Sequence, residues 1–119
     1  MTLQIDARNK EAFLELQEKL VKSNKDLNEV VQKVVINDRN KRKCRLTLEE
    51  IVNLPGGTRT YKSVGRAFLL APREDIQKEM ETYIQQCDDN VANLQKKKGY
   101  LESQIQQYEK GIEELIIKE

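Results

Sequence analysis

The chain has 119 residues, with 21 basic and 20 acidic side chains and a net charge of +1. So balanced a charge gives no overall field that favours nucleic acid or an anionic membrane. No apolar run reaches the roughly 18 residues of a membrane span, and no signal peptide is recognisable, so we expect the cytosol. Charged residues make up 34% of the chain and aromatic residues 5%, which favours a helical coiled coil over an ordinary globular core.

The residues that usually carry catalysis or bind metals are scarce. The chain has no histidine, and its two cysteines, Cys44 and Cys87, lack the spacing of metal ligands. Gly56 followed by Tyr61-Lys62-Ser63 imitates a phosphate-binding loop, but Tyr61 stands where that loop needs a glycine. We therefore predict no catalytic residue, no metal site and no cofactor.

A first long helix is predicted over residues 3–44, where there is no glycine or proline. Its heptad pattern predicts a seam against another helix, in which each buried leucine or valine contributes roughly 1.5 to 3 kcal/mol by area. Six of the eight seam residues are apolar, and the set is Phe13, Leu16, Leu20, Ser23, Leu27, Val30, Val34 and Asn37.

A basic cluster closes this predicted helix, formed by Arg39, Lys41, Arg42, Lys43 and Arg45. Such a cluster can bind phosphate or nucleic acid. It can also be explained by the helix dipole, which favours cations at the carboxyl end of a helix. We prefer the dipole explanation, because no aromatic side chain lies within the cluster, and we predict no nucleic-acid partner and no membrane partner.

A short helix is predicted over residues 47–54, because Thr47 and Glu50 have the spacing of a capping box. Pro55-Gly56-Gly57 then ends it in a turn. Residues 59–71 follow, where aromatic and β-branched residues flank Gly65-Arg66, and they predict a β-hairpin. A lone hairpin is marginally stable in water, so we expect this one to meet strands of other chains. The predicted oligomer interface is Tyr61, Val64, Gly65, Phe68, Leu69 and Leu70.

A second long helix is predicted over residues 72–118, with Pro72 at its start. It would return along the first helix as an antiparallel coiled-coil hairpin. With Cys44 opposite Glu74, Cys87 would lie roughly 20 Å from Cys44 along the axis, too far for a disulfide. The predicted seam is Ile84, Cys87, Val91, Leu94, Lys98, Leu101, Ile105, Tyr108, Ile112 and Leu115.

Apolar residues also gather where the two chain ends should meet. Three consecutive apolar residues, 115–117, cannot all point into a seam between two helices. They indicate either a frayed helix end or a tip that grips exposed apolar segments of another protein. The candidate binding tip is Leu3, Ile5, Ile112, Leu115, Ile116 and Ile117.

The segment Tyr61-x-x-Val64-Gly65-Arg66-x-Phe68-x-Leu70 stands between two heptad helices, after Leu46-Thr47-x-x-Glu50-Ile51. In this arrangement the chain resembles the β class of prefoldin subunits. The resemblance implies a mostly α-helical fold, a long coiled-coil hairpin with one β-hairpin at its base. It also implies a heterohexamer of this chain with two α-class and three other β-class subunits, in which the hairpins form a β-barrel platform.

The function implied by the resemblance is that of a cytosolic, ATP-independent co-chaperone. Such a complex captures unfolded actin and tubulin at the tips of its coiled coils and passes them to the cytosolic chaperonin. Two other functions remain open from the residues alone. One is a coiled-coil tether or assembly factor that binds a single folded partner, and the other is a nucleic-acid module built on residues 39–45.

Overall fold

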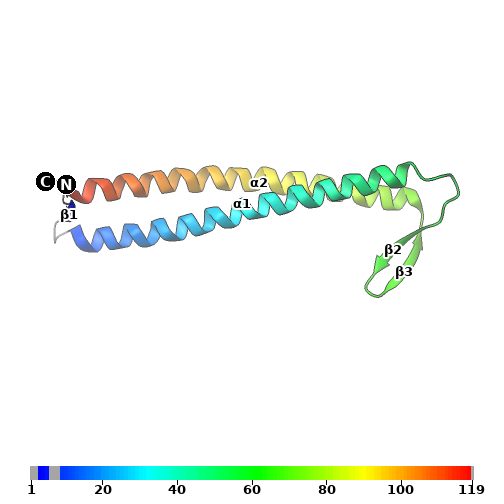
Figure 1. The fold of residues 1–119 in the computed structure, drawn as a ribbon, viewed down its shortest axis with the longest axis horizontal. Helices are drawn as coiled ribbons and strands as arrows, with labels where there is room; N and C mark the ends of the chain where they lie inside the picture. Colours follow the sequence, from blue (N-terminus) through cyan, green and yellow to red (C-terminus); the bar gives the residue numbers. More distant parts are fainter. Residues whose placement is uncertain (1–2, 6–8, 119) are drawn as a thin grey trace. The chain divides into compact units, whose positions relative to one another are not determined.

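The computed structural model describes residues 3–5 and 9–118, with side chains described for residues 9–116. The elements follow in the order β1 (Leu3–Ile5), α1 (Lys10–Val52), β2 (Thr60–Val64), β3 (Ala67–Ala71), α2 (Arg73–Leu115) and β4 (Ile116–Lys118) (Figure 1). Two long helices with an antiparallel pair of strands between them confirm the predicted fold class.

Two compact units make up the chain. The first combines Met1–Lys33 with Asn93–Glu119, and the second is Val34–Ala92. Both helices contribute to both units, because α1 and α2 each run through a boundary between them.

In the first unit, residues at the predicted seam positions of α1 and α2 are the least exposed. Leu101 and Ile105 of α2 are buried, and Ser23 and Val30 of α1 are buried as well. The polar Ser23 therefore lies in the seam, as the heptad predicts. Lys98 occupies a seam position too, and it keeps its ammonium group at the surface, 3.8 Å from the carboxylate of Glu102.

Gly111 lets the two helices of this unit approach closely. A Cβ atom placed on Gly111 would come within 3.3 Å of Cδ1 of Leu16, whereas one placed on Gly99 would meet no atom within 4 Å. Glycine usually costs a helix about 1 kcal/mol relative to alanine. The close approach of Leu16 explains why a glycine occupies position 111 in spite of this cost. Nothing in the structure explains the glycine at position 99.

In the second unit, α1 is longer than predicted. We expected it to end near residue 44 and a separate helix to cover residues 47–54, but α1 continues without a break to Val52. The hydroxyl group of Thr47 donates to the carbonyl oxygen of Lys43 at 3.0 Å, so the predicted capping box does not form. The heptad in fact continues through this segment, since its next seam residues are all partly buried: Lys41, Cys44, Leu48 and Ile51.

The longer α1 also corrects the predicted pairing of the helices. Cys44 lies opposite Met80, whose carbonyl oxygen is 3.6 Å from the Cys44 sulfur, and not opposite Glu74. The ammonium group of Lys41 pairs with the carboxylate of Asp88, one residue beyond Cys87. Lys41 and Cys44 are about 4.5 Å apart along the helix axis, so the predicted separation of roughly 20 Å between the two cysteines is wrong. Both cysteines are nevertheless free thiols.

The chain ends also depart from the prediction, which had helix from residue 3 and to residue 118. The strand β1 pairs with β4 in a two-stranded antiparallel sheet, with Gln4 opposite Ile117. Consecutive isoleucines at 116 and 117 favour a strand, because β-branched side chains are less restricted there than in a helix. This sheet resolves the difficulty of residues 115–117, since α2 ends at Leu115 and the next two residues are in β4.

Candidate functional surfaces

The first candidate surface is the hairpin of β2 and β3, which projects from the helices of the second unit (Figure 1). Gly65 has a φ of 60° and the following Arg66 does not have a positive φ, as in a type II′ turn. Val64 and Ala67 are directly opposite each other, so Gly65 and Arg66 are the two turn residues, as predicted. The turn fixes the register and with it the face on which each side chain lies.

The strand pairing sorts the predicted interface residues onto two faces. Tyr61 is opposite Leu70, and Ser63 is opposite Phe68, so the apolar members of these pairs share one face. Val64 and Leu69 lie on the other face, with Lys62. The register thus shows which residues of the predicted interface share a face.

All of these interface side chains are exposed in the single chain. Phe68 is 73% exposed, and Leu70 is 65% exposed. Within the part of the chain that the structure describes, β2 and β3 pair with each other and with no further strand, so the outer edge of each keeps unpaired backbone groups. Apolar faces and open edges together are what a strand from another chain would cover.

Polar contacts within the second unit join the hairpin to α2 and fix the segments at its base. The ammonium group of Lys62 lies 2.7 Å from the carboxylate of Glu79 on α2. The guanidinium group of Arg73 donates to the carbonyl oxygen of Leu54 at 2.8 Å, which ties the start of α2 to the segment after α1. The hydroxyl group of Thr60 donates to the carbonyl oxygen of Ala71 at 2.7 Å and closes the base of the hairpin.

The second candidate surface is the predicted binding tip in the first unit. The structure brings its backbone together, because β1 holds residues 3 and 5 and β4 holds residues 116 and 117. Ile112, Leu115 and Ile116 are partly buried. The side chains of Leu3, Ile5 and Ile117 lie outside the described residues.

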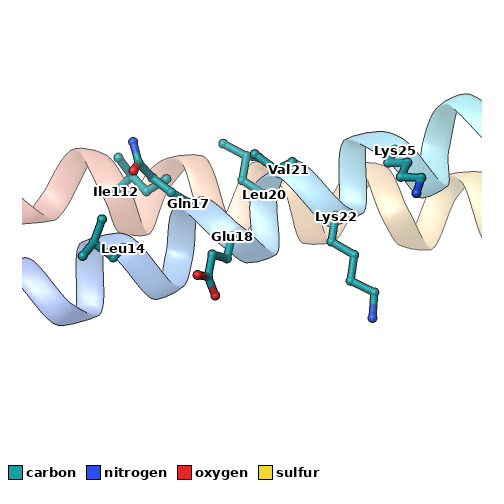
Figure 2. Close-up of a pocket in the computed structure, with 8 residues that line it drawn as sticks. All are labelled: Leu14, Gln17, Glu18, Leu20, Val21, Lys22, Lys25 and Ile112. Atoms are coloured by element: carbon teal, nitrogen blue, oxygen red, sulfur yellow. The ribbon is translucent and has the colours of Figure 1, made fainter.

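Near this end, sequence reasoning missed an apolar groove of about 790 Å³. Leu14 and Val21 line it from α1 and are 51% and 69% exposed, and Ile112 of α2 lines it as well. Figure 2 shows these side chains, with Glu18 and Lys22 pointing away from Leu20 and Val21. Leu14 and Val21 directly follow the seam residues Phe13 and Leu20, so they form a second apolar heptad repeat beside the seam. This repeat was the sequence signal from which the groove could have been predicted. The residues lining the groove are Leu14, Gln17, Glu18, Leu20, Val21, Lys22, Lys25 and Ile112.

The cysteines form a small cluster with Tyr83 in the second unit. Burial raises the pKa of the Cys44 thiol, and the nearby Cys87 raises it further. A hydrogen bond with Cys87 raises the pKa of the Tyr83 hydroxyl group, and burial adds to this shift. A thiol that stays protonated is a poor nucleophile, so these groups indicate packing between the helices.

The described residues offer neither a metal site nor a membrane-spanning helix. Among residues 3–5 and 9–118, no group of three acidic or cysteine side chains is placed to hold a metal ion. No helix in this part of the chain is long and apolar enough to cross a membrane.

Comparison with known proteins identifies the family. The family model described as "Prefoldin subunit" matches residues 14–119. The chain belongs to the prefoldin subunit family. Relatives named prefoldin subunit 1 and a solved prefoldin beta subunit confirm the predicted resemblance to prefoldin.

Prefoldin subunits from distant eukaryotes match nearly the whole chain. A prefoldin subunit 1 from Arabidopsis thaliana is 34% identical over 96% of this chain and 89% of the relative. A probable prefoldin subunit 1 from Dictyostelium discoideum is 32% identical over 92% of this chain and 96% of the relative. Prefoldin subunit 1 from Homo sapiens is 29% identical over 98% of this chain and 96% of the relative.

A solved structure shows the same fold. The crystal structure of the prefoldin beta subunit from Thermococcus strain KS-1 superposes with a TM-score of 0.77 at 18% identity, over 93% of this chain and 94% of that chain. Prefoldin subunits are non-enzymatic co-chaperones that assemble with one another. This chain is therefore a chaperone subunit and not an enzyme.

Proposed function

We propose that this prefoldin subunit joins a heterohexamer of two α-class and four β-class subunits through its β2–β3 hairpin. In that complex its β1–β4 end and the adjacent apolar side chains contact unfolded proteins, with actin and tubulin as clients. The complex works in the cytoplasm without ATP and passes its clients to the cytosolic chaperonin.

The observation that carries the assembly part is the exposure of the hairpin. Tyr61, Phe68 and Leu70 share one face and are each more than half exposed. Each apolar side chain of this size gains roughly 1.5 to 3 kcal/mol when it is fully buried. A free hairpin forgoes this gain, and a sheet completed by neighbouring subunits recovers it.

The client-binding part is supported by the apolar residues of the first unit. Val21 is 69% exposed beside the groove that Ile112 also lines. A groove of this kind offers a weak apolar contact, and several subunits with similar ends hold one chain through multivalency. Release then needs no nucleotide, because each separate contact is weak.

Native mass spectrometry of the complex purified through this chain tests the assembly. We expect a hexamer in which this chain is joined by five other small subunits, whose sequences contain long heptad patterns. A single folded partner in one-to-one ratio would instead identify a tether or assembly factor and contradict the proposal.

The client part needs a separate assay with the intact hexamer. We expect it to suppress aggregation of denatured actin and tubulin without ATP, and to yield folded actin once the cytosolic chaperonin is added. Replacement of Ile112, Leu115 and Ile116 with serine should weaken the suppression. Unchanged suppression by hexamers of normal size would contradict the placement of the client site at this end and leave the assembly proposal intact.

A further inference from the structure

The basic cluster lies in the interior of α1. The helix-dipole explanation, which placed the cluster at the carboxyl end of a helix, therefore has to be reconsidered. Residues 39–45 would be stabilised by the helix dipole only within the last turn of a helix. The helix continues to Val52, and its last turn contains no basic residue. The dipole therefore does not account for the cluster.

One of the five cations has a structural role. Lys41 is partly buried, and its ammonium group pairs with the carboxylate of Asp88 on α2. The other four cations are exposed, and within the described residues no carboxylate lies at ion-pairing distance from any of them. We call these four the basic stripe: Arg39, Arg42, Lys43 and Arg45.

Like charges are neighbours within the basic stripe, and Asp38 and Glu49, each four residues from one arginine, offset only part of this repulsion. Arg39 is three residues before Arg42 and four before Lys43, and Arg42 is three before Arg45. Residues at these spacings are neighbours on a helix surface, and like charges there are unfavourable. A partner with negative charge would relieve this repulsion.

Exposed apolar side chains lie at both ends of the stripe on the surface of α1. Val35 and Ile36 are 50% and 51% exposed, and Leu46 is 58% exposed. Ile36 precedes Arg39 by three residues, and Leu46 follows Lys43 by three, so these side chains continue the stripe along the helix. The distance from Val35 to Leu46 is about 16 Å at the helical rise.

Two shallow hollows are part of the same surface. One, of about 310 Å³, is lined by Val35, Asp38, Arg39 and Arg42. The other, of about 180 Å³, is lined by Asp38, Lys41, Arg42 and Arg45. The guanidinium groups thus border recesses that can receive a carboxylate, which an arginine binds through two parallel hydrogen bonds.

We propose that this face of α1 docks an acidic amphipathic segment of a partner protein. The partner places carboxylates against the basic stripe and apolar side chains against Val35, Ile36 and Leu46. Charge complementarity identifies the acidic centre, and the exposed apolar ends identify its flanks. The face differs from the hairpin and from the groove of the first unit, so the proposal does not depend on the client-binding function.

Protein is favoured over nucleic acid for two reasons. No aromatic residue lies between residues 35 and 46, so there is no platform on which bases could stack. Exposed valine, isoleucine and leucine suit apolar side chains of a peptide better than a phosphate backbone.

The test uses the full chain assembled with the other prefoldin subunits. The probe is a fluorescein-labelled helical peptide with glutamates at its centre and leucines at both ends, and fluorescence anisotropy measures its binding. A peptide with glutamine in place of every glutamate is the first control, and short single-stranded and duplex DNA are the second.

The stripe variant carries Arg39→Gln, Arg42→Gln, Lys43→Gln and Arg45→Gln. Its matched control removes the same charge from exposed positions of α2, with Lys78→Gln, Lys96→Gln, Lys97→Gln and Lys110→Gln. We expect the stripe variant to bind the acidic peptide at least about tenfold more weakly and the control to bind within about twofold of the parent chain. Added salt should weaken binding to the parent chain.

A second variant, Val35→Ser, Ile36→Ser and Leu46→Ser, keeps the charges and should weaken binding while the salt dependence stays. Circular dichroism and complex size verify that every variant is folded and assembled. Equal loss in the stripe variant and its charge-matched control would overturn the proposal. Tighter binding of DNA than of the acidic peptide would overturn it in favour of a nucleic-acid surface.

Discussion

The two sheets that the structure describes have the same number of strands and the same antiparallel pairing, yet they form for different reasons. The β2–β3 sheet joins two strands of five residues through a two-residue turn, so neighbouring residues in the sequence specify it. The β1–β4 sheet joins two strands of three residues from opposite ends of the chain. It depends on helices that bring those ends together. The comparison separates a sheet encoded locally from one created by tertiary structure.

The exposed face of the local sheet should give the largest effect. Phe68→Asp places a charge among Tyr61, Phe68 and Leu70 on the face that we expect neighbouring subunits to cover. Burying an unpaired charge is so unfavourable that we expect loss of hexamer on size exclusion, with the helical circular dichroism of the chain retained.

Leu69→Asp is the matched control for this prediction. It introduces the same charge one residue away, on the face that already carries Lys62, and we expect partial assembly. Equal loss from both variants would show that the two faces of the hairpin are covered alike, and a normal hexamer from Phe68→Asp would contradict the interface.

The turn of the local sheet offers a second way to break it. Gly65→Ala forces a residue with a Cβ atom to adopt a φ of 60°, which costs roughly 1 to 2 kcal/mol. We expect a corresponding fall in the affinity of the chain for its partner subunits, measured by titration of the remaining complex.

Gly56→Ala tests whether that effect comes from backbone conformation. Gly56 does not have a positive φ, and a Cβ atom there would meet nothing within 4 Å. We expect this variant to assemble as the parent chain does. If both alanine variants assemble equally well, the turn does not control the hairpin.

The sheet formed by the chain ends should respond to backbone changes in β4. Ile117→Pro removes a backbone N–H from the middle of β4, so it should weaken the pairing with β1. We expect weaker suppression of client aggregation and a Tm lowered by no more than a few degrees, because the strands are short and terminal.

Ile117→Thr distinguishes backbone pairing from apolar character at the same position. Threonine keeps the N–H and the β-branched shape that favours a strand, but it reduces the apolar surface. If Thr impairs client capture as much as Pro does, apolar contact is decisive, whereas impairment by Pro alone would identify the paired strands. Full capture by both would contradict a client role for β4.

The smallest effect concerns the cysteine cluster between the helices of the second unit, away from both sheets. The pKa of Cys44 is raised above its ordinary value of 9.0 in the folded chain. Above that pH the unfolded chain releases the thiol proton more readily than the folded chain does, so stability falls as pH rises. At lower pH the thiol is protonated in both states, and this term is constant.

Cys44→Ser removes the thiol and retains a small polar side chain. We expect the Tm of the parent chain to fall slightly more steeply above pH 9.0 than the Tm of the variant. Tyr83, whose pKa is also raised, remains in both proteins and contributes the same trend. Parallel profiles across this range would show that the cysteine does not contribute.

Much of the fold and part of the candidate site could be predicted from local patterns. Every residue assigned to a heptad seam, from Phe13 to Leu115, is buried or partly buried in the structure. The hairpin was predicted because Gly65 and its β-branched and aromatic neighbours have clear local preferences. The groove that Leu14 and Val21 line was missed because these residues stand next to the heptad seam. The seam residues alone were enough to predict the helix, so the neighbouring apolar repeat was not considered.

Where local signals competed, the prediction was wrong. Thr47 and Glu50 match a capping box, but the same segment also carries the heptad through Leu48 and Ile51. Burial of those seam residues against α2 outweighs a cap that contributes about 1 kcal/mol. The basic cluster was consequently assigned to the end of a helix when it lies within one.

By itself, the sequence determined which residues form the seams of the two helices and where the chain turns back through a hairpin. It could do so because heptad spacing and turn chemistry act over a few residues. Only the tertiary structure decided that Lys41 meets Asp88 and that Leu3–Ile5 pairs with Ile116–Lys118. Those pairings join residues far apart in the chain. Their register follows from the combined packing of many seam residues, which no single segment encodes.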